Sequence, residues 1–77
     1  MEDLLADVAR LLVDEPDAVS VESFEEGEDT IVLELSVAQG DVGKVIGRQG
    51  RTINALRTVV RTSARGDGRR ILVDVVD

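Results

Sequence analysis

Two glycines spaced three residues apart, Gly47 and Gly50, enclose the polar pair Arg48 and Gln49 in the middle of the chain. Because glycine has no Cβ, a turn with this spacing allows another polymer's backbone to approach the peptide closely. A helix that follows such a turn points its partially positive amino end toward the ligand, and phosphates are favoured at that position. These four residues therefore indicate a clamp for a phosphodiester backbone.

The distribution of charge favours an anionic ligand at this turn, although the whole chain has a net charge of −7. Residues 1–43 contain thirteen acidic residues and one basic residue, a net charge of −12. Residues 44–70 contain eight basic residues and one acidic residue, a net charge of +7. Lys and Arg neutralise phosphates, so the basic block that begins at the turn is consistent with nucleic acid. Neutralisation of the acidic half within the fold is the alternative interpretation.

The composition argues against an enzyme. The chain has no cysteine and no histidine, which excludes disulfides, a thiol nucleophile and an imidazole base. No carboxylates form a recognisable pair with a nucleophile, a base or a metal motif. The acidic residues between positions 25 and 29 are predicted to be a solvated hairpin tip. We therefore expect no catalytic residues, no metal and no cofactor.

The length and the start of the chain set the expected organisation. A sequence of 77 residues supports one domain, which we expect to span residues 1–77. The first residues are acidic and contain neither a basic signal-peptide region nor the run of about 18 apolar residues that crosses a bilayer. The prediction is a cytoplasmic protein without a membrane segment.

Hydrophobic periodicity predicts the order α-β-β-α-α-β. Helical spacing predicts helices over residues 2–14 and 50–64, and a short helix from Asp41 that Gly47 ends in a left-handed conformation. Alternation of apolar and polar residues predicts the strands and their turns. The strands are expected at 19–24, 30–37 and 71–76, with a hairpin connection at 25–29 and a turn at 65–70.

Connection lengths predict how the strands pair. The short connection between the first two strands requires an antiparallel pair, whereas a crossover through two helices returns the third strand parallel to the second. The helices are expected on the face that carries Ile31, Leu33, Leu35 and Val37. The predicted fold class is therefore α+β, a two-layer sandwich with a three-stranded mixed sheet and helices on one face.

This order of elements, with the segment GKVIGRQGRTINALR, resembles a type II KH domain, in which a GXXG loop joins two helices. The chain is also similar, over essentially its whole length, to the small bacterial KhpA family of stand-alone KH proteins. The resemblance is carried by Lys44, Val45-Ile46, the GXXG loop at 47–50, Arg51 and the Ala55-Leu56-Arg57 run. The chain departs from the expected pattern in its acidic N-terminal half and in having one basic residue between the two glycines, which predicts modest affinity.

The resemblance implies a non-catalytic protein that binds single-stranded RNA with low sequence specificity, as an RNA chaperone or post-transcriptional regulator. KH domains hold about four nucleotides against the GXXG loop. The apolar residues before the loop, with the edge of the final strand, would form a groove for bases, although Val45 and Ile46 also suit a core. The predicted RNA-binding residues are Lys44, Gly47, Arg48, Gln49, Gly50, Arg51, Val42, Val45, Ile46 and Arg57.

Two other functions remain open from the sequence. Residues 42–62 could form a helix-turn-helix DNA binder, although the flanking strands and the glycine spacing argue against it. A protein-interaction module could use the first helix or the outer sheet face at Val32, Leu72 and Val76. The resemblance implies pairing with a second copy or with a larger KH-containing RNA-binding protein. The single aromatic residue, Phe24, is expected in the core or the sheet and disfavours folds that stack bases on several aromatics.

Overall fold

A computed structural model describes residues 2–63 and 68–76 of the chain. The described elements follow the order α1-β1-β2-α2-α3-β3, with short 3₁₀ turns between several of them, so the predicted order and α+β class are confirmed. The elements are α1 (Glu2–Leu12), β1 (Ser20–Glu26), β2 (Thr30–Ser36), α2 (Val42–Ile46), α3 (Arg51–Ser63) and β3 (Arg70–Val76).

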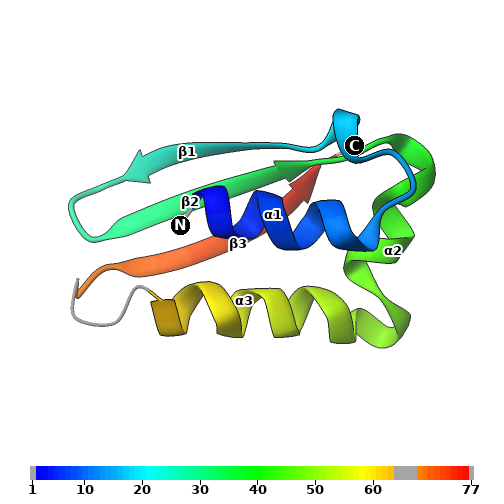
Figure 1. Cartoon of the computed structure of the whole chain (residues 1–77). Helices are drawn as coiled ribbons and strands as arrows, with labels where there is room; N and C mark the ends of the chain where they lie inside the picture. Colours follow the sequence, from blue (N-terminus) through cyan, green and yellow to red (C-terminus); the bar gives the residue numbers. More distant parts are fainter. Residues whose placement is uncertain (1, 64–67, 77) are drawn as a thin grey trace.

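The sheet has the predicted topology. Strand β2 is central, pairs antiparallel with β1 and pairs parallel with β3. The helices lie on one face of the sheet: α1 crosses in front of the strands and α3 runs alongside β3 (Figure 1). No helix of residues 2–63 and 68–76 lies over the other face of the sheet (Figure 1).

The core lies between the sheet and the helix layer. Side chains alternate along a strand, so the odd-numbered residues of β2 share the inner face. Leu33 and Leu35 are almost completely buried there, together with Ile71 and Val73 of β3. The helices contribute buried residues at helical spacing, namely Leu5, Ala6, Ala9, Val45, Ile53, Leu56 and Val60. One apolar cluster thus fixes α2 and α3 against the sheet.

Helix α1 ends at Leu12, two residues before the predicted end. The backbone N–H groups of Asp14 and Glu15 donate to the carboxylate of Asp41, at 3.2 and 3.0 Å. These amides would otherwise donate to carbonyls of the continuing helix. Asp41 therefore ends the helix from a position 27 residues later in the chain.

The first strand is longer than predicted, and its aromatic residue is exposed. Glu25 and Glu26 continue the ladder opposite Ile31 and Thr30, so the turn contains only residues 27–29. Gly27 permits this tight reversal with a φ of 71°. Phe24 lies in β1 with 46% of its surface exposed, so the expectation of a sheet position is confirmed and that of a core position is wrong.

The outer face of the sheet is acidic in one row and apolar in the next. The strand registers place Glu22, Glu34 and Asp74 side by side, and Phe24, Val32 and Leu72 in the adjacent row. Neighbouring carboxylates on a sheet repel one another and create a negative potential. A polyanion is therefore disfavoured on this face, and the basic residues must be sought on the helices and at the β3 edge. Residues 65–67 of the predicted 65–70 turn and residue 64 of the predicted 50–64 helix lie outside the described residues.

Candidate nucleic-acid interface

The GXXG loop has a backbone that depends on its glycines. Gly47 has φ 77° and ψ 172°, a region that is essentially restricted to glycine. The left-handed helical conformation predicted at Gly47 is found instead at Gln49, with φ 58° and ψ 26°. Gly50 also has a positive φ of 76°. The chain thus reverses within four residues, from the end of α2 to the start of α3.

The two glycines serve different purposes. A Cβ on Gly47 would clash with the side chain of Thr52 and lie 2.9 Å from its backbone nitrogen. A Cβ on Gly50 would meet nothing closer than 3.8 Å. Gly47 is therefore required to pack the loop against the first turn of α3. The backbone at Gly50 faces more open space, where a ligand could approach it.

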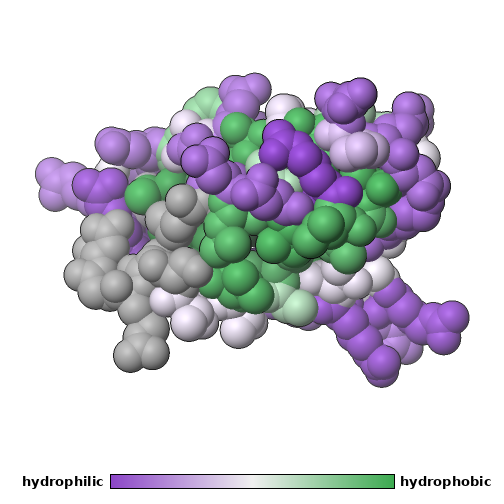
Figure 2. Space-filling model, in the orientation of Figure 1, coloured by the Kyte–Doolittle hydropathy of each residue, from purple (hydrophilic) through white to green (hydrophobic). Residues whose placement is uncertain are grey.

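The charges of the loop are exposed. Arg48, Gln49 and Arg51 all lie on the surface. Within the described residues, neither arginine has a hydrogen bond or ion pair from its side chain to another residue. In Figure 2, strongly hydrophilic side chains project from the lower corner of the molecule where Figure 1 places the α2–α3 loop. Both guanidinium groups are therefore available to an anion.

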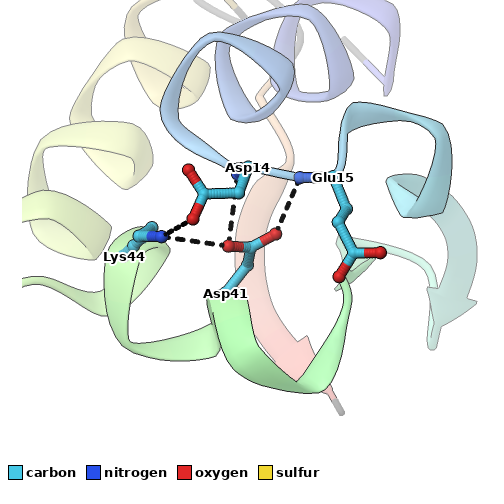
Figure 3. Close-up of polar contacts among 4 residues, drawn as sticks. All are labelled: Asp14, Glu15, Asp41 and Lys44. Atoms are coloured by element: carbon cyan, nitrogen blue, oxygen red, sulfur yellow. Dashed lines mark hydrogen bonds and ion pairs between the residues drawn. The ribbon is translucent and has the colours of Figure 1, made fainter.

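Lys44 differs from these arginines because its ammonium group is already paired. It donates to a carboxylate oxygen of Asp14 and, at 3.4 Å, to Oδ1 of Asp41 (Figure 3). The hydrogen bond to Asp14, reinforced by Asp41 and opposed by partial burial, raises the pKa of Lys44 above its usual value. The structure thus directs this predicted phosphate ligand toward the segment after α1, away from the loop.

Asp41 organises this cluster and was not among the predicted site residues. Its side chain is only 3% exposed. Burial by itself raises the pKa of the Asp41 carboxyl, but hydrogen bonds from the backbones of Asp14 and Glu15 and from Lys44 outweigh it and hold the pKa below its usual value. An aspartate just before a helix normally suggests an N-cap, yet this carboxylate makes no cap and bridges to another segment.

An apolar groove of about 500 Å³ lies beside the loop, between α3 and the edge of β3. Ile46 is 37% exposed and lines this groove. Val45 is 0% exposed in the core, and Val42 packs against that core, so neither contributes to the groove wall. The lining residues are Ile46, Ile53, Arg57, Asp74, Val75 and Val76. The sequence predicts the edge of the final strand as part of the groove, and the residues of that strand that line it are Asp74, Val75 and Val76.

Arg57 connects the two sides of the groove. Its Nε and Nη2 donate to the carbonyl oxygen of Val73, at 3.3 and 3.1 Å, and its Nη1 donates to Asn54 Oδ1 at 3.1 Å. Val73 belongs to β3, whose outer edge has no neighbouring strand in the sheet. The guanidinium therefore occupies part of an open edge and holds α3 beside it. Its positive charge remains at the wall of the groove.

A GXXG loop between two helices, next to a groove along the edge strand of an α-β-β-α-α-β sandwich, defines the chain as a type II KH domain. The sequence model of the family "KhpA/KhpB, KH domain" matches residues 2–75, and the chain belongs to that family.

Relatives with the same printed name cover nearly the whole chain. The "RNA-binding protein KhpA" of Clostridium acetobutylicum is 46% identical, over 99% of this chain and 100% of the relative. That of Halalkalibacterium halodurans is also 46% identical, over the full length of both chains. That of Chlamydia trachomatis is 39% identical, over 100% of this chain and 97% of the relative. No solved structure matches the chain significantly. Among the described residues, no helix is both long and apolar enough to cross a membrane.

Proposed function

We propose that this chain is a non-catalytic protein that binds single-stranded RNA with low sequence specificity, through a single KH domain spanning residues 1–77. The observation that carries this proposal is the glycine-built loop at 47–50, which directly follows Ile46 of the apolar groove. The side chains of Arg48 and Arg51 are exposed there and pair with no other described residue. The family match and the printed names of the relatives as RNA-binding proteins support it.

The loop and the groove would bind different parts of the RNA. Phosphates approach the open backbone at Gly50 and pair with Arg48 and Arg51, while Gln49 supplies a neutral donor. Such phosphate contacts position a strand without reading its sequence. Bases lie against Ile46, Ile53 and Val75, which offer apolar contact and no aromatic ring. Low specificity follows from this division.

Asp74 introduces a chemical bias within the groove. Its carboxylate repels phosphates and can accept a hydrogen bond from the amino group of cytosine or another base. The position of Asp74 therefore favours base edges over the sugar-phosphate backbone at this end of the groove. Weak selection of this kind suits an RNA chaperone or a post-transcriptional regulator in the cytoplasm of a bacterium, which is the cellular role we propose.

The double substitution Arg48→Asp/Gln49→Asp tests the loop mechanism. We expect affinity for single-stranded RNA to fall at least tenfold, because two negative charges would face the phosphates. The circular dichroism spectrum and melting temperature should remain nearly unchanged, since both side chains are exposed. The matched control is Arg10→Asp/Gln39→Asp, which makes the same chemical change at exposed positions away from the loop. Undiminished affinity in the folded loop variant would refute the mechanism.

A competition experiment between single-stranded RNA and duplex DNA distinguishes this function from that of a helix-turn-helix DNA-binding protein. The loop and the narrow groove suit one strand, so unlabelled duplex should compete poorly. Efficient displacement of the RNA by duplex DNA would contradict the proposal.

Pairing with another protein is a second function that a specific observation favours. Apolar atoms gather over the middle of the helix layer in Figure 2, and α1 and α3 carry the exposed residues Leu11, Leu12 and Val59. Leu11 is 85% exposed and adjoins Leu12, which is 38% exposed, and contiguous exposed apolar residues mark protein-interaction sites. The partner we propose is a second copy or a larger KH-containing RNA-binding protein. Analytical ultracentrifugation of the wild type and of Leu11→Glu tests self-association. If the two proteins sediment with the same mass, self-association through α1 is excluded.

A further inference from the structure

A second basic site lies at the far end of the α3–β3 seam from the GXXG loop. Arg61 on α3, with Arg69 and Arg70 around the start of β3, lines a pocket of about 470 Å³, and Ile71 and Leu72 complete it. In Figure 1 the GXXG loop lies at the right end of α3, whereas the start of β3 lies at the left end. We call this second site the arginine pocket.

The side chains of the arginine pocket are weakly engaged within the fold. Arg69 approaches Glu25 at 3.8 Å, and both side chains are exposed, so this contact contributes little. The guanidinium groups of Arg61 and Arg70 have no hydrogen bond or ion pair to any residue in the described ranges 2–63 and 68–76. The backbone of Arg70 is anchored, because its N–H donates to the carbonyl of Asp29 at 2.7 Å. Three cationic groups therefore line one concavity and suit a phosphate.

The arginine pocket and the apolar groove follow one another along the same strand edge. The pocket uses the first residues of β3 and the groove uses the last three, with Val73 between them. The bond from Arg57 to the Val73 carbonyl marks this division. Arg57 and Arg61 are four residues apart on α3 and so share one helix face. A basic track thus continues from the groove to the arginine pocket.

We propose that the arginine pocket binds the phosphodiester backbone of the same RNA strand after it leaves the apolar groove. This inference rests on the function proposed above. The strand that the loop holds is about four nucleotides long, and the four residues of β3 that precede the groove extend the strand edge by roughly 13 Å. The carboxylate row of Glu22, Glu34 and Asp74 disfavours a path over the outer sheet face. The β3 edge is therefore the route along which a longer RNA gains contacts.

Comparison of RNAs of different length tests this route. A site of about four nucleotides has roughly seven registers on an RNA of about ten nucleotides, so length alone raises the affinity about sevenfold. We expect wild-type protein to bind the longer RNA at least about thirtyfold more tightly than RNA of about four nucleotides. The variant Arg61→Gln/Arg70→Gln should lose the gain above about sevenfold and retain the affinity for the short RNA. The slope of log affinity against log salt for the longer RNA should fall by about 1.4, for two lost phosphate contacts. Arg61→Lys/Arg70→Lys should keep most of the gain, because it keeps the charges.

The outcomes separate this inference from the function on which it rests. Arg10→Gln is the charge control, because Arg10 is exposed on α1 and is paired with Asp7. A gain of about sevenfold or less for the longer RNA with the wild type would overturn the proposal for the arginine pocket and leave the loop mechanism standing. Failure of both RNAs to bind would overturn both. Saturable binding of inorganic pyrophosphate that Arg61→Gln/Arg70→Gln abolishes, without a gain above about sevenfold for the longer RNA, would identify a small-phosphate site and also refute the RNA route.

Discussion

Charged residues before and after α2 lie in opposite environments, although only a few residues separate them. At the start of the helix, Asp41 is buried, and Lys44 and two backbone amides satisfy it. At its end, Arg48 and Arg51 carry charges that no other described residue pairs. The first cluster holds α1 to α2, and the second is open to a ligand. The difference between them shows that a basic residue close to a binding loop does not necessarily bind the RNA, because carboxylates of the protein can already hold its charge.

The backbone shows the same contrast. Residues around Asp41 adopt ordinary conformations and satisfy their polar groups. In the loop, Gly47, Gln49 and Gly50 all have positive φ values. Glycine adopts such conformations at little cost, whereas at Gln49 the positive φ is strained and persists because the surrounding structure enforces it. The comparison predicts that stability depends on Gly47 and Asp41, whereas RNA affinity depends on the open backbone of the loop and on the charges of Arg48 and Arg51.

The largest effect is expected from Gly47→Ala. The added Cβ would clash with Thr52, and alanine disfavours the backbone conformation of Gly47, so the free energy of unfolding should fall by about 3 kcal/mol. Gly43→Ala is the matched control within α2, since a Cβ there meets nothing within 4 Å. It should be neutral or stabilise by about 0.5 kcal/mol. Equal stability of the two variants in urea unfolding would show that the loop tolerates a side chain at Gly47.

Asp41→Asn should lower the melting temperature by several degrees, because the amide would replace a charged acceptor of two backbone amides and Lys44. The folded-state pKa of Asp41 is lowered, so its stabilisation is complete above the ordinary aspartate value of about 3.9 and is lost as the pH falls through the lowered value. The difference in melting temperature between wild type and variant should be constant near neutral pH and narrow below about pH 4. A difference that widens in acid would contradict the assigned direction of the shift.

The removal of one positive charge from each of the two clusters tests the comparison directly. Arg51→Gln should weaken RNA binding about threefold, for one lost phosphate contact, with little change in melting temperature. Lys44→Gln should lower the melting temperature and leave RNA affinity within about twofold, because Asp14 and Asp41 already hold that ammonium group. Fluorescence anisotropy with labelled RNA measures both. The reverse pattern would assign Lys44 to the RNA and remove the distinction between the two ends.

Local pattern was sufficient to predict the element order, the strand pairing and the position of the loop. Alternation in β2 and the glycine spacing are properties of adjacent residues. The interactions that sequence reasoning missed join distant segments: Asp41 reaches the amides of residues 14 and 15, and Arg57 reaches the carbonyl of Val73. Asp41 also accepts from Lys44, so both Lys44 and Arg57, which the sequence predicts to bind RNA, have a partner within the protein. The buried position of Val45 was equally hidden, because an apolar residue on a short helix suits a groove and a core alike.

The smallest effect on stability is expected from Gln49→Gly, which isolates the backbone of the loop from its side chain. Glutamine at a φ of 58° costs about 1 kcal/mol, which glycine would relieve. Glycine also increases the entropy of the unfolded chain by a similar free energy, so stability should change by no more than about 0.5 kcal/mol. Affinity for RNA should fall only slightly if the backbone of the loop supplies the main contacts. Near-complete loss of binding by a variant that unfolds like the wild type would instead make the Gln49 side chain, and not the glycine-built backbone, the principal contact of the loop.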